Sequence, residues 1–285
     1  MLHYKFYGQF ANFGIQYCLA RIISLKTGLA YNPPRHFLTK HGQPVTWSGE
    51  PLFRMAPGDG KTVVTTGTPY IIDALQWVDL HAIPHDRPVI VRQFFAQRYE
   101  LLQPYKHMIR EEWLRIPPER FLPVDPDCLV VHVRRGDYLD IEPGVPANPE
   151  RQGTATTIDE YLTCLERFPD AKSVQFVTDD AADPFIGQLG EVMGLPWTCQ
   201  QMPWDYDFLL LASARNLAIS QSTFSWLAAF LGHAERIVCS VRPGTFWGRG
   251  LGVYGPYTGP GAEQGYDYPN LFVSDEPGRW EWVTK

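Results

Sequence analysis

The chain has 285 residues, of which 45% are hydrophobic and 20% are charged, enough for one large domain or two smaller ones with separate cores. Its 25 basic and 31 acidic residues give a formal net charge of −6, which disfavours broad binding to the phosphates of nucleic acids. The five cysteines follow no disulfide or zinc-site spacing, so we expect buried thiols in a reducing cytoplasm.

The N-terminal segment shows neither a secretion signal nor a membrane span. Lys5 and the glycines and asparagine that follow it interrupt every apolar stretch in the first 26 residues. The longest apolar runs of the chain are far shorter than the roughly 18–20 residues that a transmembrane helix needs. The sequence therefore predicts a cytoplasmic protein without a transmembrane segment.

In the N-terminal half, the pattern of apolar residues predicts four elements. In chain order they are a strand over residues 3–7, a helix over 13–26, a strand over 89–95 and an amphipathic helix over 98–115. Four prolines between residues 117 and 126 then exclude a helix interior or a central strand there. We place a linker at this point. It divides the chain into an N-terminal domain of residues 1–122 and a C-terminal domain of residues 123–285.

The C-terminal half alternates short apolar strands with helices. The expected strands lie at 128–133, 173–178, near 197, at 217–220 and at 237–241, and the expected helices at 158–168, 184–193, 206–214 and 224–231. This alternation predicts an α/β fold with a parallel sheet covered by helices on both faces. In such folds the ligand binds in loops at the carboxyl ends of the strands.

The strongest motif lies at the expected exit of the first of these strands, in the segment Val131–Tyr138. Arg134 and Arg135 are adjacent there, so their side chains leave the strand toward opposite faces. A guanidinium group binds phosphate oxygens through short, charge-assisted hydrogen bonds. The alternative is a loop stabilised by an ion pair between an arginine and Asp137, with no ligand.

These residues carry a family resemblance. His132, Arg134, Arg135, Asp137 and Tyr138 match the HxRRxDY signature of the glycosyltransferase family 11 α-1,2-fucosyltransferases. Three further segments resemble that family, in the same order along the chain: GQFANFGIQY at 8–17, FVTDD at 176–180 and STFSWLAAFL at 222–231. The sequence departs from the family pattern at Ala11 and Phe13, and Leu227 replaces a tryptophan. The resemblance covers residues 8 to 231.

The resemblance implies a GT-B architecture, in which two Rossmann-like domains face a cleft. The N-terminal domain would lie on the acceptor side, and the C-terminal domain would bind the GDP-sugar. It also implies an inverting transfer of L-fucose from GDP-fucose to a sugar hydroxyl, with the 2-hydroxyl of a galactoside in a surface glycan as the expected acceptor. The alternatives are a related GT-B transferase with another GDP-sugar or acceptor hydroxyl, and a catalytically inactive glycan-binding protein.

The expected catalytic residues are Arg134 and Asp137. A leaving nucleoside diphosphate gathers negative charge, which Arg134 would stabilise in the absence of a metal ion. Arg135 either assists or has a structural role. The sequence does not identify the base that deprotonates the acceptor hydroxyl. Asp137, Asp140 and Glu142 are the candidates.

The expected contacts to GDP-fucose come from residues in all four motifs: Gly8, Asn12, His132, Arg134, Arg135, Asp179, Asp180, Ser222, Thr223 and Ser225. The two aspartates would accept hydrogen bonds from guanine. The hydroxyl residues open a helix whose N-terminus attracts an anion, or they only cap it. His132 would line the cleft or act as a base.

No metal or other cofactor is expected. An aspartate pair without nearby Glu or His is a poor ligand set for a divalent cation. The expected partners are the GDP-sugar donor and an oligosaccharide acceptor, and a lipid-linked acceptor would bring the protein into peripheral contact with a membrane.

Overall fold

The computed structural model describes residues 1–6, 8, 10–33, 46–47, 50–55, 60–73, 79–92, 99–135, 155–199, 202–240 and 279–283. These residues belong to two compact units. Those of the first lie within Met1–Pro117, and those of the second begin at Pro118. The division falls a few residues before the boundary that the prolines suggest, at residues 122 and 123. Among the described residues, no helix is long and apolar enough to cross a membrane.

The described part of the first unit contains a three-stranded parallel sheet in the order β1-β6-β5. Its elements are β1 (Leu2–Tyr4), α1 (Phe10–Thr27), β5 (Tyr70–Asp73) and β6 (Val89–Arg92). Two short antiparallel pairs complete it, β2 (Thr46–Trp47) with β3 (Glu50–Pro51) and β4 (Arg54–Met55) with β7 (Leu114–Arg115). Strand β5 lies outside the elements that the sequence predicts.

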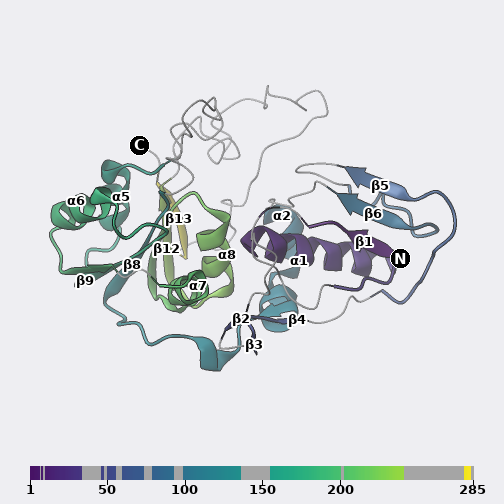
Figure 1. Ribbon diagram of the computed structural model, residues 1–285, viewed down its shortest axis with the longest axis horizontal. Helices are drawn as coiled ribbons and strands as arrows, with labels where there is room; N and C mark the ends of the chain where they lie inside the picture. Colours follow the sequence, from purple (N-terminus) through teal and green to yellow (C-terminus); the bar gives the residue numbers. More distant parts are fainter. Residues whose placement is uncertain are drawn as a thin grey trace, which may run out of the picture. The chain divides into compact units, whose positions relative to one another are not determined.

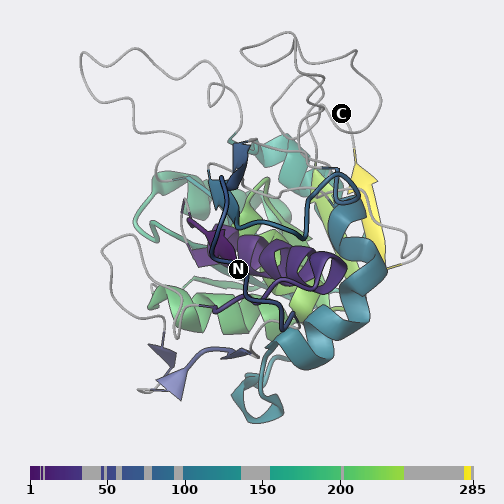
Figure 2. The ribbon, with the colours of Figure 1, turned by 90° about the vertical axis from the view of Figure 1, so that its right-hand side faces the viewer.

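Helix α1 is buried along most of its length, and it carries one buried charge. Arg21 donates a hydrogen bond to the Tyr17 hydroxyl, 3.3 Å away, and its guanidinium lies 4.6 Å from the centre of the Trp113 ring. A guanidinium over an aromatic face gains electrostatic attraction that offsets part of its desolvation. Figures 1 and 2 show the helical segment that begins with α2 (Tyr99–Leu102) crossing α1 at a steep angle.

The continuous helix expected over 98–115 is wrong. The segment divides into α2 (Tyr99–Leu102), the 3₁₀ turn η1 (Gln103–Tyr105), α3 (Lys106–Met108) and the π-helical η2 (Ile109–Trp113). Pro104 lies in the 3₁₀ turn, where its missing N–H removes a helical hydrogen bond. A further 3₁₀ turn, η3 (Pro118–Arg120), begins with a proline of the expected linker.

The described part of the second unit is a parallel α/β sandwich, as predicted. Its strands are β8 (Cys128–Val133), β9 (Ser173–Thr178), β10 (Trp197–Cys199), β11 (Asn216–Ile219), β12 (Arg236–Ser240) and β13 (Trp280–Val283). They follow the spatial order β10-β9-β8-β11-β12-β13, which is the 3-2-1-4-5-6 order of the dinucleotide-binding fold. All neighbouring pairs are parallel.

Helices cover both faces of this sheet. Figure 1 shows α5 (Ile158–Leu165) and α6 (Pro184–Met193) on one face, with α7 (Trp204–Ser213) and α8 (Thr223–Leu231) on the other. Residues Leu129, Val131 and Val133 of β8 join the apolar core under α5 and α6. The alternate residue of β8, His132, points to the other face, where its ring lies 5.8 Å from that of Phe224 on α8.

Local signals fix the helix ends. Asp183 caps the start of α6 by accepting a hydrogen bond from the Phe185 amide, and Pro184 occupies the first helical position. Gly194 ends the same helix in the left-handed conformation, with φ of 69°. Thr157 and Glu160 form a reciprocal capping box at the start of α5. These ends explain why the sequence predicts α6 with its observed bounds.

Strand β13 was not predicted from the sequence. It pairs with β12, and Arg279, directly before it, ties it to the end of α8. The Arg279 guanidinium donates to the carbonyl oxygens of Ala229, Gly232 and Ala234 at 2.8–3.1 Å. A cation at a helix C-terminus is favourable because the last carbonyls carry partial negative charge.

Candidate functional site

The candidate site lies at the edge of the second unit's sheet where β8, β9 and β11 end. From β8 the chain continues to β9 and β10 on one side of the sheet, whereas β11, β12 and β13 extend on the other side. The order of the strands therefore reverses between β8 and β11, and ligands of such folds bind at this reversal. Arg134 follows β8, Asp179 follows β9, and Ser220 follows β11.

Arg134 is held by Asp179. Val133 and Thr178 are direct partners in the parallel register, so the next residue of each strand reaches the edge at the same level. The Arg134 Nη1 lies 3.3 Å from Asp179 Oδ2, and the Asp179 Oδ1 accepts a hydrogen bond of 3.1 Å from the Arg135 amide. Their side chains are 21% and 28% exposed, so the pair is open to solvent on one side. One carboxylate thus fixes both the backbone and the side chain at the exit of β8.

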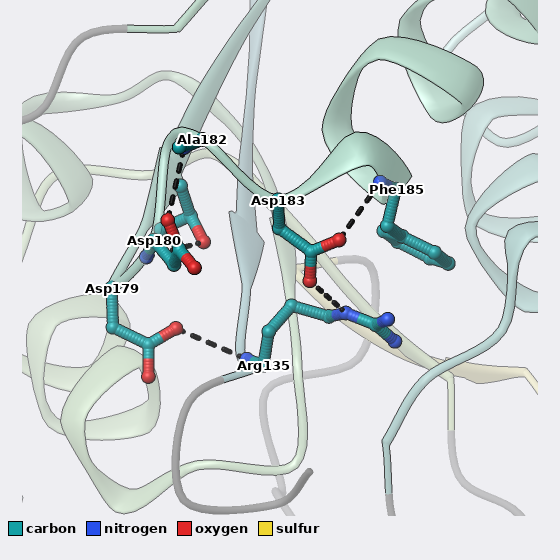
Figure 3. Close-up of polar contacts among 7 residues, drawn as sticks. Arg135, Asp179, Asp180, Ala182, Asp183 and Phe185 are labelled. Carbon is teal, nitrogen blue, oxygen red and sulfur yellow. Dashed lines mark hydrogen bonds and ion pairs between the residues drawn. The ribbon is translucent and has the colours of Figure 1, made fainter. Parts of the chain in front are cut away.

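Arg135 is held by the start of α6. Its Nε donates to Asp183 Oδ2 at 2.9 Å, and its guanidinium lies 4.1 Å from the centre of the Phe185 ring. Figure 3 shows this arrangement. Burial opposes ionisation of Asp183, but the hydrogen bonds from Arg135 and from the Phe185 amide hold the pKa of this carboxyl below its ordinary value. The sequence leaves open whether Arg135 assists Arg134 in catalysis or has a structural role. These contacts favour the structural role.

Asp180 takes part in the turn after β9. Its Oδ1 accepts a hydrogen bond of 3.0 Å from the Ala182 amide, and its own amide donates to the Thr178 hydroxyl. Figure 3 shows Asp179 and Asp180 pointing in different directions from this turn. Asp179 faces Arg135 and the ion pair with Arg134, whereas Asp180 closes its own loop. Recognition of guanine by these two carboxylates stays a prediction.

His132 is buried and neutral. Its Nδ1 lies 2.6 Å from the Ser220 hydroxyl oxygen, across the point where the strand order reverses. Burial and, secondarily, the positive charge of Arg134 lower the pKa of this imidazole to about 3. A group of such low basicity is a poor acceptor of a proton near neutral pH, so the geometry favours a contact role for His132 over that of a base.

The three predicted hydroxyl residues occupy different positions at the start of α8. Ser222 is the N-cap and accepts a hydrogen bond of 3.3 Å from the Phe224 amide. Thr223, the first residue of the helix, is partly exposed. Ser225 is fully buried and donates to the carbonyl oxygens of Ser220 and Ser222. The Ser225 hydroxyl thus holds the loop that joins β11 to α8.

Gly8 and Asn12 belong to the first unit, where Gly8 lies just before α1 and Asn12 lies in the first turn of that helix. Gly8 has φ of 86°, a left-handed conformation that side-chain-bearing residues rarely adopt. A Cβ atom at this position would lie 2.5 Å from Nδ2 of the Asn12 side chain. The positive φ therefore favours glycine at this position, and a larger residue would also displace the Asn12 side chain.

Some predicted residues lie outside the described part of the chain. They are the base candidates Asp137, Asp140 and Glu142, together with Gly136 and Tyr138 of the motif. Among the described residues, no group of three or more His, Cys, Asp or Glu side chains could hold a metal ion.

Asp207 is a candidate that the sequence analysis missed. It lies in the first turns of α7, next to Phe208, whose ring packs edge-on against that of Phe224 at 5.5 Å. The side chain is buried, and burial followed by repulsion from Asp205 raises its pKa to about 7. Strongly perturbed carboxyls gather at functional sites. The signal in the sequence is an acidic residue beside the apolar run FLLLA, which a search for motifs does not register.

The raised pKa of Asp207 predicts a pH-dependent stability. The folded state binds a proton here that the unfolded state has released, so this contribution to the free energy of unfolding is lost as pH rises from about 4 to about 7. An Asp207→Asn variant mimics the neutral carboxyl. Its melting temperature, relative to the parent, should therefore increase as pH rises from 5 to 8.

Thermal unfolding at several pH values tests this expectation. The matched control is Asp170→Asn, which removes an exposed carboxyl after α5. A difference between Asp207→Asn and the parent that stays constant over this range, as for the control, contradicts a carboxyl that titrates near neutrality.

Comparisons with known proteins return remote structural similarities. No protein-family profile and no curated protein matches the chain. Solved structures of POFUT1 match it in part. The complex with GDP is 16% identical over 53% of this chain and 55% of that chain, with a TM-score of 0.34. A complex with GDP-fucose is 15% identical over 53% and 54%, also with a TM-score of 0.34. The chain thus spans about half the length of the structures that it matches.

Proposed function

We propose that the protein is a glycosyltransferase that moves L-fucose from GDP-fucose to a sugar hydroxyl, with inversion at the transferred carbon. The observation that carries this proposal is the position of Arg134. It leaves β8 at the point where the strand order of a dinucleotide-type sheet reverses, and Asp179 holds it there. The motif around Arg134 supports the choice of a fucosyltransferase, and the 2-hydroxyl of a galactoside is the expected acceptor.

The chemistry requires stabilisation of a leaving diphosphate. As the bond between fucose C1 and the phosphate oxygen breaks, the electron pair goes to GDP, and its β-phosphate gains negative charge. A guanidinium group carries five N–H donors in a planar fork, which suits the oxygens of a phosphate. The ion pair with Asp179 orients that fork before the substrate binds, and donors oriented in advance lower the barrier without reorganisation.

The start of α8 offers a second contact for the diphosphate. Backbone amides at a helix N-terminus carry partial positive charge, and this helix begins at the loop after β11. The Ser222 hydroxyl caps the helix, while Thr223 stays partly exposed at its first position. Arg134 and this N-terminus follow adjacent strands and reach the same edge of the sheet.

The acceptor hydroxyl must lose its proton as its oxygen attacks C1. The neutral and weakly basic imidazole of His132 does not suit this task. Asp137 remains the proposed base, with Asp140 and Glu142 as alternatives. In this scheme Asp179 and Asp183 position the two arginines, and no step needs a metal ion.

The test is release of GDP from GDP-fucose in the presence of a panel of galactosides, with EDTA throughout. We expect fucosylated product, detected by mass, and little gain from added Mg²⁺ or Mn²⁺, because Arg134 takes the place of the cation. Loss of activity in EDTA that Mn²⁺ restores would overturn the metal-independent scheme. Binding of an oligosaccharide without release of GDP would identify a glycan-binding protein instead.

An Arg134→Lys substitution separates charge from geometry. Lysine keeps the positive charge but loses the planar fork, so turnover should fall by on the order of a hundredfold or more. The matched control is Arg215→Lys, which changes an exposed arginine paired with Glu235 and should leave turnover unchanged. Steady-state kinetics compares the two variants. Near-normal turnover of Arg134→Lys would remove this residue from the mechanism.

A further inference from the structure

The hydrogen bond between His132 and Ser220 determines which nitrogen of the imidazole carries the proton. Ser220 is 1% exposed, and His132 is 4% exposed, so neither side chain can exchange its partner freely with water. The Ser220 oxygen lies 2.6 Å from the imidazole Nδ1. Two arrangements fit this distance. Either the hydroxyl donates to Nδ1, or a protonated Nδ1 donates to the hydroxyl oxygen.

The two arrangements differ in what they leave unpaired. Within the described residues, the imidazole Nδ1 is the hydrogen-bond partner of the Ser220 hydroxyl. If Nδ1 were the donor, the hydroxyl proton of Ser220 would be buried without an acceptor. Such a group has given up its hydrogen bond to water and gains none in the protein, which costs free energy. If the hydroxyl donates, its proton is satisfied, and the imidazole proton resides on Nε2. The second arrangement is therefore the stable one.

The surroundings of the ring keep the imidazole neutral. Arg134 lies two residues further along the chain, just after β8. Val177 is the partner of His132 on β9, and the Phe224 ring packs against the imidazole from α8. Among the described residues, no carboxylate hydrogen-bonds to the ring. A protonated imidazole would thus be a second positive charge beside Arg134 in a buried position. The ring is therefore neutral, and its one N–H proton resides on either Nδ1 or Nε2.

Ser220 is itself held in place. Its carbonyl oxygen accepts hydrogen bonds from the Ser222 amide at 2.7 Å and from the Ser225 hydroxyl at 3.3 Å. The start of α8 therefore fixes the backbone of Ser220, and its side chain fixes His132. This connection joins two segments that lie 88 residues apart in the sequence.

We propose that Ser220 is a positioning residue that holds the proton of His132 on Nε2, which makes His132 a hydrogen-bond donor to an acceptor atom of the ligand. The ligand part of this inference rests on the proposed function, because the acceptor would belong to the nucleotide of the donor sugar. The tautomer itself does not depend on any ligand. His132 acts in this account as a fixed donor and not as a base.

The first test is NMR spectroscopy of the parent protein labelled with ¹⁵N in its histidine rings. The chain has eight histidines, so the signals of His132 are assigned by their loss in His132→Gln. We expect the pattern of a neutral ring protonated on Nε2, unchanged between pH 5 and 8. A ring protonated on Nδ1, or one that titrates in this range, overturns the proposal without any variant at Ser220.

The second test compares Ser220→Ala with Ser220→Thr. The alanine variant lacks the hydroxyl and should give a mixture of both tautomers, whereas threonine retains the hydroxyl and should restore the Nε2–H form. The matched control is Ser213→Ala. It removes a hydroxyl on α7 that hydrogen-bonds to Leu209 and Leu122, and it should leave the ring unchanged. A pure Nε2–H form in Ser220→Ala shows that Ser220 does not hold the tautomer.

Calorimetry with GDP tests the ligand part. In Ser220→Ala the dissociation constant for GDP should rise in inverse proportion to the fraction of Nε2–H rings that NMR measures, about twofold for an equal mixture, and in Ser220→Thr it should equal that of the parent. Unchanged affinity in Ser220→Ala, despite a changed tautomer, overturns the role of His132 as a donor to the ligand. A parent protein that binds no GDP contradicts the proposed function, while the NMR result for the tautomer still stands.

Discussion

The ion pair between Arg134 and Asp179 organises the candidate site. Parallel pairing of β8 with β9 brings the two residues to the same level of the sheet, and the same carboxylate accepts the Arg135 amide. The direction of the Arg134 side chain thus follows from the register of the central strands. An arginine held in this way can meet a phosphate without first losing the freedom of a long side chain, so binding energy is available for the transition state.

The two adjacent arginines have taken separate tasks. Arg135 stacks on Phe185 and bonds to Asp183, the residue that also caps α6. Arg135 thereby joins the end of β8 to the first turn of α6, the helix that follows β9. Arg134 pairs instead with Asp179, the residue that follows β9. Each arginine is thus paired with its own carboxylate, Arg134 with Asp179 and Arg135 with Asp183. This pairing explains why two like charges can occur side by side at the end of a buried strand.

Local sequence signals predict much of the second unit, because its elements have clear ends. Strand β8 is a mostly apolar run, and α6 begins at an aspartate-proline pair and ends at Gly194. Signals that depend on distant parts of the chain were not visible. Strand β13 exists through its pairing with β12. The division of the predicted helix over 98–115 has a local cause, because Pro104 interrupts the helical hydrogen bonds, and the apolar pattern of the segment did not reveal it. The site shows the same limit. The motif indicates Arg134, whereas the roles of Asp183, Asp207 and Ser220 depend on contacts that only the fold creates.

The central claim is that the edge formed by the ends of β8, β9 and β11 binds a nucleoside diphosphate through Arg134. Titration calorimetry of GDP and of guanosine, with the parent and with Arg134→Gln, tests it most directly. The account predicts that the parent binds GDP at least about a hundredfold more tightly than guanosine, equivalent to about 2.7 kcal/mol, and that most of this difference disappears in Arg134→Gln. Equal affinity for GDP and guanosine in the parent, or an undiminished preference for GDP in Arg134→Gln, would contradict it.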